Sequence, residues 1–553
     1  MYDRESLLNI DKINEVESAS GLNAPDSNES INRANQLLVE AEADEIIKGI
    51  LKEFAVFCSL PHGSGNEAQL VELLCKRFQD EGFNAYITDG NNFICDIPAV
   101  KGMEDAPLVA LQGHIDMVCA VRENSAYDPS TDAIAMKIDV DGSGKRILSS
   151  TGDSSLGADC GMCDAAVIWL LTSSEEKFAH GPLRLIFTVE EEEGLLGAKE
   201  LKKSVLDNVK YLINLDGFDA DHIVAGCSGG RSEIFSKDCE SMSFEPENLK
   251  EWCAFEFTLT GFKGGHSGYD IDKGRVNAIK LIADLLADMF ENEMSYLLSS
   301  FNGGVQHNII PSSASAVVVF RREELIKCQR SIQMLMYELS MHYGESDWGG
   351  RFVYHEIALP RRVLTEQCTK SVVKFVHGLC NGVYAYTDIE KDRDGALVVD
   401  TSINIGKISC KASASKDSNH EGKIEILIFL RAISDTFSSI LLRMNNEAAE
   451  EYGFESTNVE YPSWHFDKSS ELLNAACRAY RKITGKTAVA TAAHVGLEPA
   501  VFTELAPDLE MISMGADIRN AHSISESVNL GSVKEFILTL KDLLSNIGNV
   551  SGE

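Results

Sequence analysis

Positive charge is scarce in this chain. Among its 553 residues, 50 lysines and arginines stand against 85 aspartates and glutamates, which gives a formal net charge of -35. A surface of this sign repels phosphate groups, so nucleic acids and anionic membrane surfaces are excluded as expected partners.

Long apolar runs are also missing. No stretch approaches the roughly 20 uncharged residues that cross a bilayer, and residues 1–30 lack the basic and then apolar layout of a secretory signal. We therefore expect a cytoplasmic protein. The 44% hydrophobic and 24% charged composition is typical of globular proteins, and 553 residues exceed one compact core, so two or three domains are expected.

Paired cysteine motifs are few. The fourteen cysteines are scattered and many lie in apolar runs, which indicates buried reduced thiols rather than a disulfide framework. Only Cys160-Gly161-Met162-Cys163 has the spacing of a redox or zinc motif, and a second such pair is missing. Buried small side chains are the favoured interpretation, with a structural zinc or a thioredoxin-like role as the alternative.

The composition and the helix and strand patterns of the sequence predict four segments. Residues 1–42 are polar and acidic and are expected to form a flexible extension, after which helical and strand patterns alternate over 43–225 as in a largely parallel α/β domain. Glycine-rich turns and longer strands mark 226–467 as a separate α+β domain, and 468–553 returns to the first domain. The middle domain is therefore predicted to be an insertion. The final helix is expected to begin with a capping box, Ser532-x-x-Glu535.

Three apolar segments of the first domain end at groups that bind metals. Residues 108–111 lead to His114, residues 183–187 lead to Glu191, and residues 211–215 lead to Asp216. Ligands of open α/β sheets bind beyond the carboxyl ends of the strands, so these side chains are expected at one edge of one sheet.

Taken singly, each of these motifs has an ordinary alternative. At the end of a strand, side chains two residues apart point the same way, so the Asp116 carboxylate can bond the ring of His114. A surface loop with incidental polar residues would show the same sequence. Asp159 lies between glycines that permit an inward turn, although it can equally cap the helix that follows.

The run Glu190-Glu191-Glu192-Glu193 follows an apolar strand. Adjacent carboxylates repel one another unless a cation compensates them, and neighbouring glutamates can then divide metal binding from proton transfer. A solvated charged face is the ordinary reading of such a run. His522, in a loop before the last helix, is likewise either a ligand or a structural residue, and small neighbours leave His266 exposed in a turn.

Several motifs together resemble the M20 metallopeptidases, and most closely the aminoacyl-histidine (Xaa-His) dipeptidases, or peptidase D. The resemblance runs in order from about residue 45 to the C-terminus through the following motifs: Ser59-Leu60-Pro61-His62-Gly63-Ser64-Gly65-Asn66-Glu67, Gly113-His114-Ile115-Asp116, Leu156-Gly157-Ala158-Asp159, Glu190-Glu191-Glu192-Glu193-Gly194, Leu212-Ile213-Asn214-Leu215-Asp216, Gly264-Gly265-His266-Ser267-Gly268, His307-Asn308-Ile309-Ile310-Pro311, Tyr461-Pro462-Ser463-Trp464 and His494-Val495-Gly496-Leu497-Glu498. Cys160 stands where the family usually has Asn, and Ile524 where it usually has Pro.

The resemblance implies a mostly parallel-sheet catalytic domain with an inserted lid, and a centre with two Zn2+ per chain, for which Co2+ or Mn2+ are alternative ions. Asp159 would bridge the ions, His114 and Asp216 would complete one, and Glu192 and His522 the other. Glu191 would be the general base and Asp116 the partner of His114.

On the lid, the resemblance implies that His266 reaches the oxyanion of the transition state. Asn308, Arg431 and Gly496 are expected to contact the substrate; Arg431 would pair with the free carboxylate of a dipeptide, or alternatively belongs to a structural ion pair.

The implied activity is hydrolysis of dipeptides, Xaa-His dipeptides resembling carnosine among them. The alternatives within the family are a tripeptidase and an amidohydrolase of N-acyl amino acids. A catalytically idle peptide-binding or scaffold protein is the alternative from another class. A homodimer is one expected assembly.

Overall fold

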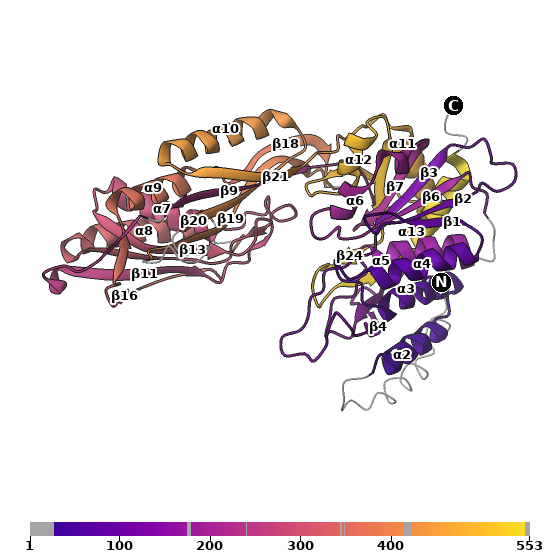
Figure 1. Cartoon of the computed structure of the whole chain (residues 1–553), viewed down its shortest axis with the longest axis horizontal. Coiled ribbons are helices and arrows are strands. Elements are labelled where there is room, and N and C mark those ends of the chain that lie inside the picture. The colour runs from indigo at the N-terminus through magenta and orange to yellow at the C-terminus, as the bar shows by residue number, and fades with distance from the viewer. Residues whose placement is uncertain are drawn as a thin grey trace.

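A computed structural model describes residues 27–173, 178–238, 240–342, 346–347, 349–392, 394–413 and 423–547. Two lobes lie side by side along the longest axis of the molecule (Figure 1). Each lobe has its own buried apolar cluster, one built from residues 39–227 and 464–547 and the other from residues 235–454.

The first lobe is built on an eight-stranded sheet of order β1-β2-β6-β3-β7-β23-β8-β22. Its strands are β1 (Asn84–Ile87), β2 (Phe93–Ile97), β3 (Leu108–His114), β6 (Leu183–Thr188), β7 (Val209–Gly217), β8 (His222–Cys227), β22 (Val489–Ala493) and β23 (Glu510–Gly515). The central pairs β6-β3, β3-β7 and β7-β23 are parallel, as is β8-β22. The pairs β1-β2, β2-β6 and β23-β8 are antiparallel.

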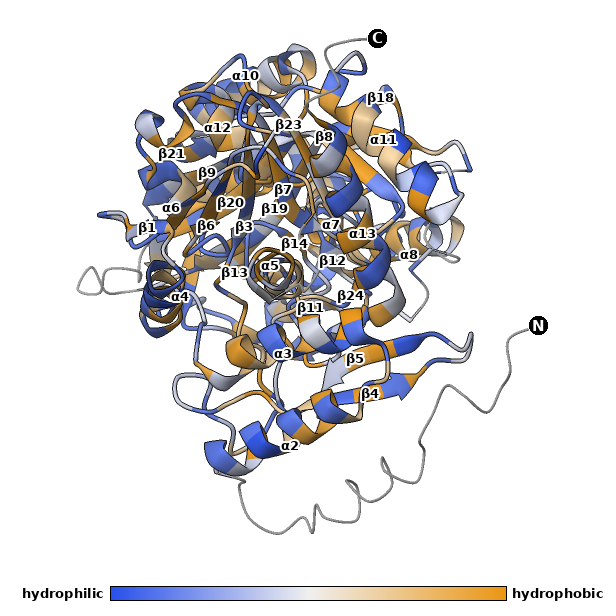
Figure 2. Ribbon diagram, turned by 90° about the vertical axis from the view of Figure 1, so that its right-hand side faces the viewer, coloured by the Kyte–Doolittle hydropathy of each residue, from blue (hydrophilic) through white to orange (hydrophobic). Residues whose placement is uncertain are grey.

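Helices cover both faces of this sheet. Side chains on both sides of each central strand are therefore buried, which explains why these strands are nearly continuous apolar runs. The helices of this lobe are α2 (Asn28–Ala41), α3 (Glu45–Ser59), α4 (Ala68–Asp80), α5 (Gly161–Ile168), α6 (Leu196–Glu200), α11 (Glu471–Thr484), α12 (Pro499–Leu505) and α13 (Leu530–Asn546), with short helical turns at η1 (Trp169–Ser173) and η2 (Lys203–Leu206). All eight residues of α5 are buried, and Figure 2 shows this helix nearly end-on in the interior.

A four-stranded sheet of order β24-β25-β5-β4 lies beside this lobe. Its strands are β4 (Met136–Val140), β5 (Arg146–Ser150), β24 (Ile518–Arg519) and β25 (Ser527–Asn529). Because β25 pairs with β5, the loop that carries His522 lies beside the segment that leads to Asp159.

The second lobe is an antiparallel sheet of order β16-β11-β15-β13-β19-β20-β9-β21, with β18 paired to β19. Its strands are β9 (Gly229–Asp238), β11 (Trp252–Thr260), β13 (Tyr296–Gly304), β15 (Ala314–Arg321), β16 (Arg351–Ile357), β18 (Gly382–Glu390), β19 (Leu397–Lys411), β20 (Lys423–Ala432) and β21 (Glu455–Tyr461). Helices α7 (Ala278–Glu291), α8 (Leu325–His342), α9 (Glu366–Gly378) and α10 (Asp435–Tyr452) pack on it, and the turns η3 (Leu249–Glu251) and η4 (Arg322–Glu324) flank its strands. Two small ribbons complete the lobe, β10 (Ser241–Ser243) with β17 (Arg362–Leu364) and β12 (Gly265–His266) with β14 (Ile309–Ile310).

The predicted fold class, a mostly parallel sheet with an inserted α+β domain, is confirmed. The exact segment boundaries stay a prediction. No helix in the described ranges is both long and apolar enough to cross a membrane.

Two local expectations are wrong. Residues 28–41, expected to be flexible, form helix α2, which is anchored because the buried Asn35 side chain donates to the Ile134 carbonyl at 2.9 Å and accepts from the Met136 amide at 2.9 Å; residues 1–26 lie outside the described ranges. The last helix is capped by Asn529, whose side chain accepts from the Gly531 amide, and not by Ser532.

Candidate functional site

His114 is the last residue of β3 and is 1% exposed. Its Nδ1 lies 3.0 Å from the Asp116 carbonyl oxygen and 3.5 Å from the Asp116 carboxylate. The ring therefore donates from Nδ1, mainly to the carbonyl rather than to the expected carboxylate, and Nε2 is left with a lone pair for a ligand. That Nε2 lies 3.3 Å from Asp159 Oδ1 and 4.0 Å from Asp216 Oδ1.

The Asp116 carboxylate has a second task at the glutamate run. Its Oδ1 accepts from the Glu191 amide at 3.0 Å, and its Oδ2 accepts from the Glu192 amide at 3.2 Å and from the Ser64 hydroxyl at 2.7 Å. Asp116 thus fixes the backbone from which both glutamate side chains extend. Ser64 belongs to a motif noted in the sequence, but its spacing to Asp116 gave no sign of this contact.

Asp159 lies between two groups of candidate ligands. Its Oδ1 faces His114, while its Oδ2 lies 2.9 Å from His522 Nε2, which is also 2.7 Å from Glu192 Oε1. Three sets have ligand atoms within 4.8 Å of one another: His114, Asp159 and Asp216; Asp159, Glu192 and His522; and His114, Glu191 and Glu192. Asp159 is not the cap of α5, because the capping position is Cys160.

The charges of this cluster favour a compensating cation. Burial raises the pKa of Asp216 well above its ordinary value, and the neighbouring Asp159 carboxylate raises it further. Burial lowers the pKa of His522, but hydrogen bonds to Asp159 and Glu192 outweigh it and raise that pKa to about 11. The two carboxylates thus stabilise the protonated, positively charged form of His522. A metal ion would supply a larger positive charge at the same place.

The donor set fits two divalent metal ions. Imidazole nitrogens and carboxylate oxygens are ligands of zinc, and a bridging carboxylate is the feature that two adjacent ions need. Of the glutamate run, Glu191 and Glu192 face the cluster, whereas Glu193 is exposed and the Glu190 amide bonds the Glu67 carboxylate at 3.1 Å.

His266 lies on the insertion, on the short strand β12. Its Nδ1 accepts from the amides of Gly268 at 3.1 Å and Tyr269 at 3.3 Å. Burial lowers the pKa of His266 to about 3, and the Arg431 cation lowers it in the same sense. The ring is therefore neutral, and its single proton sits on Nε2.

Arg431 on β20 is 4% exposed. Its guanidinium stacks on the Phe429 ring at 4.5 Å and donates to the Tyr461 hydroxyl at 3.1 Å. Its Nη2 lies 3.5 Å from His266 Nε2. Both of these nitrogens are donors in this tautomer, so they do not hydrogen-bond to each other, and each can donate to an acceptor oxygen on the substrate side.

The remaining predicted substrate contacts lie around this pair. The Asn308 carbonyl accepts from the Ser267 amide at 2.8 Å, next to His266. A Cβ on Gly496 would come within 2.6 Å of the Tyr461 hydroxyl, so this glycine makes room for the ring that holds Arg431. Tyr461 was noted as part of a motif, but its role depends on contacts between lobes that sequence spacing does not reveal.

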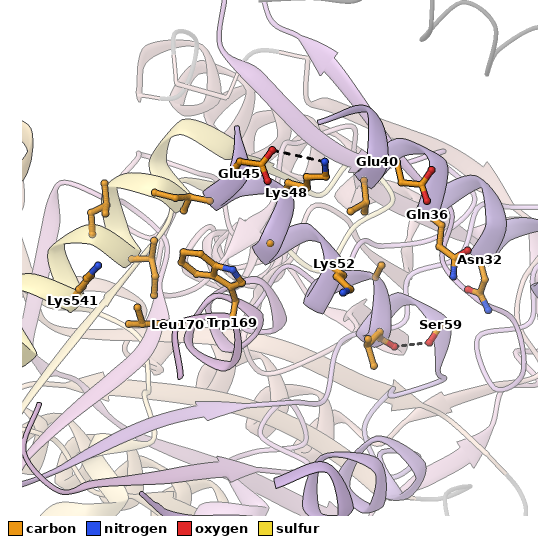
Figure 3. Close-up of a pocket in the computed structure, with 17 residues that line it drawn as sticks. Asn32, Gln36, Glu40, Glu45, Lys48, Lys52, Ser59, Trp169, Leu170 and Lys541 are labelled. Atoms are coloured by element: carbon orange, nitrogen blue, oxygen red, sulfur yellow. Dashed lines mark hydrogen bonds and ion pairs between the residues drawn. The ribbon is translucent and has the colours of Figure 1, made fainter. Parts of the chain in front are cut away.

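Two other features stand apart from this cluster. The thirteen cysteines among the described residues are free, and Cys160 and Cys163 are buried. A cavity of about 1140 Å³ lies between α2, α3, η1 and α13, with Trp169 on one wall (Figure 3). None of the predicted site residues lines it.

The model of peptidase family M20/M25/M40 matches residues 156–546. The cytosol non-specific dipeptidase of Escherichia coli strain K12 is 29% identical over 499 residues, which cover 89% of this chain and 96% of the relative.

Solved structures show the same architecture. The aminoacylhistidine dipeptidase from Vibrio alginolyticus superposes with a TM-score of 0.74 at 28% identity and covers 92% of this chain and 97% of its own. A tripeptidase from Staphylococcus aureus reaches a TM-score of 0.54 at 14% identity, with 91% and 99% of the two chains covered, which shows a shared fold alone.

Proposed function

The chain belongs to peptidase family M20/M25/M40 and is therefore a hydrolase of peptide bonds, and from that premise we propose that it is a two-zinc dipeptidase. The observation that carries the proposal is the position of Asp159, whose two carboxylate oxygens face two different sets of ligands. One carboxylate shared in this way would suit a site for two metal ions.

The proposed ligand sets follow the contacts. His114, Asp159 and Asp216 would hold one zinc ion, and Asp159, Glu192 and His522 the other. When bound, zinc makes water acidic enough to attack at neutral pH and polarises the scissile carbonyl. Asp116 would keep the His114 proton on Nδ1 and the glutamate backbone in place, so that the ligands need not rearrange when metal binds.

Glu191 is the proposed general base. Burial raises the pKa of Glu191 well above its ordinary value, so the buried carboxylate has a higher affinity for a proton than an exposed one. Its carboxylate lies within 4.8 Å of the ligand atoms of His114 and Glu192. Glu191 would take a proton from the attacking water and pass it to the nitrogen of the leaving amine.

His266 and Arg431 are the proposed contacts to the substrate from the lid. The neutral His266 ring offers its Nε2 proton to the oxyanion that forms at the scissile carbonyl, where a fixed donor is most effective. Arg431 would bind the free carboxylate of the dipeptide, since a buried guanidinium with several N–H groups matches a carboxylate. Asn308 and Gly496 would border the same space.

The substrate class that we propose is the dipeptide, with Xaa-His dipeptides among those cleaved. The names of the Escherichia coli and Vibrio alginolyticus relatives support this class, as does a buried arginine beside the candidate oxyanion donor. We also propose a cytosolic location, in line with the name of the Escherichia coli relative, and a homodimeric assembly.

A panel of substrates tests the proposal. The zinc-loaded protein is expected to cleave β-Ala-His and Ala-His faster than Ala-Ala-Ala or an N-acetyl amino acid, whereas faster cleavage of either of the last two would support the tripeptidase or the amidohydrolase. Loss of all four activities together with an inability to bind zinc would indicate the idle scaffold instead.

A further inference from the structure

Glu526 is a buried carboxylate that the proposed mechanism does not use. It is 2% exposed and lies four residues after His522, immediately before strand β25. The pairing of Ser527 with Ser149 on β5 places it beneath the loop that leads to Asp159.

Four consecutive backbone amides converge on this one carboxylate. Oε2 accepts from the amides of Leu156 at 2.8 Å and Gly157 at 3.0 Å. Oε1 accepts from the amides of Ala158 at 2.8 Å and Asp159 at 3.2 Å. A carboxylate has about four acceptor positions, so its hydrogen-bonding capacity is fully used.

The loop is shaped to present these amides. Gly157 has a φ of +73°, and this left-handed turn aims successive N–H groups at one point, as in the concave backbone sites that bind anions. A Cβ at Gly157 would lie 2.9 Å from Met117 Sδ and 3.1 Å from His62 Nε2, so a larger residue would have to displace these side chains as well as adopt the positive φ. The anion held by this loop is a side chain of the protein itself.

The other end of the connection is the loop of His522. His522 has a φ of +64° and Asn520 a φ of +53°, both unusual for residues other than glycine. Ser523 and Ser525 stabilise this loop from within, through hydroxyl contacts to the Asn520 carbonyl at 2.7 Å and to each other at 2.9 Å. Among the described residues of this loop, Glu526 is the one whose side chain accepts from four consecutive backbone amides of the segment that leads to Asp159.

We propose that Glu526 is a positioning residue of the metal centre: its carboxylate sets the place of the proposed bridging ligand Asp159 relative to the proposed ligand His522. This inference rests on the proposed two-zinc function and deepens it. Its consequence is that loss of the four hydrogen bonds weakens metal binding without removing any ligand, and the set of Asp159, Glu192 and His522 is affected most.

Zinc titration of Glu526→Gln tests the proposal. A glutamine accepts at one oxygen only, and its NH2 group would face two amides, so at least two of the four hydrogen bonds are lost. Competition of the full chain with a fluorescent zinc chelator gives both dissociation constants without any peptide. The weaker constant is expected to rise roughly 10- to 100-fold, the range found when groups that orient metal ligands are removed.

Glu53→Gln is the matched control. Glu53 is 5% exposed, and its Oε1 accepts from Arg77 Nη2 of α4 at 2.9 Å, away from the proposed metal ligands. Its loss is expected to affect stability but not zinc binding. Glu526→Asp, which keeps the charge but shortens the side chain by one methylene, carries the same test if the glutamine variant does not fold, with an increase of at least several-fold expected.

The outcomes separate two claims. The role of Glu526 is supported if the wild type binds two zinc ions and the weaker dissociation constant rises in the Glu526 variant but not in Glu53→Gln. Constants within twofold of the wild type in that variant, or an equal loss in Glu53→Gln, overturn it while leaving the two-zinc proposal intact. A wild-type protein that binds no zinc overturns both.

Discussion

Removal of the Arg431 guanidinium should abolish the preference for substrates with a free carboxylate. This side chain is 4% exposed, and the contacts found for it in the described structure are the Tyr461 hydroxyl, Ser267, the ring of His266 and the face of Phe429. None of these is an anion. A buried cation with only neutral neighbours is expected to bind an anionic ligand, because burial of an unpaired charge is costly.

The size of the effect follows from this burial. Truncation of one member of a buried charge pair costs about 2–5 kcal/mol, which corresponds to roughly 30- to 4000-fold in kcat/KM. The Arg431→Ala variant should therefore lose that factor toward Ala-His. Toward Ala-His carboxamide, which lacks the negative charge, the same variant should lose far less.

The assay is the ratio of kcat/KM for Ala-His to that for its carboxamide, measured in the wild type, in Arg431→Ala and in the control Arg322→Ala. Arg322 pairs with Glu356 at the exposed edge of the lid, so its removal should leave the ratio unchanged. Arg431→Lys should recover only part of the ratio, because an ammonium group lacks the planar pair of donors. A ratio in Arg431→Ala equal to that of the wild type would refute the assignment and favour a structural role.

Four further predictions concern the metal centre and the fold. Glu191→Gln should retain two zinc ions by elemental analysis yet lose nearly all turnover, and an active variant would overturn the base assignment. Treatment with a chelator should abolish hydrolysis, and zinc should restore it; activity that persists in fully metal-free protein would speak against the mechanism. Asp116→Asn should lower kcat with zinc still bound, because the amide nitrogen cannot accept from both glutamate amides; unchanged kcat would contradict its positioning role. Asp44 caps α3 and pairs with Lys534, so Asp44→Ala should cost about 1 kcal/mol of unfolding free energy in urea titrations. Burial raises the pKa of Asp44, but Lys534 and the capped amides outweigh it and lower that pKa in the folded protein. The stabilisation is therefore present above the unfolded pKa of about 4 and should fade as the pH falls below it; a difference between the two proteins that is constant down to pH of about 2 would contradict this.

Sequence reasoning singled out several of the candidate metal ligands because their signals are local. His114 and Asp216 lie at the ends of the apolar strands β3 and β7, and Glu191 follows β6; the parallel order of these strands brings their ends to one edge. The resemblance added Asp159 and His522, whose approach depends on the pairing of β25 with β5. Their assigned roles remain predictions.

The features that were missed are fixed by tertiary contacts. Helix α2 is held by the hydrogen bonds of Asn35 with residues 134 and 136. Such distant contacts cannot be predicted from the apolar periodicity of residues 1–42. The last helix begins at Leu530 because Asn529 caps it, while the Ser532 hydroxyl accepts from the Asp517 amide at 2.8 Å. Glu526 gave no signal, since its four partners are more than 360 positions away in the chain.

Metal content measured together with dipeptide hydrolysis tests the central claim most directly. Elemental analysis of the protein after zinc reconstitution, on the same sample that is assayed with Ala-His, should give two zinc ions per chain and activity that rises with occupancy. Replacement of the shared ligand in Asp159→Ala should remove both ions and the activity together. A protein that is fully active with one ion per chain, or an Asp159→Ala variant that keeps two, would contradict the account.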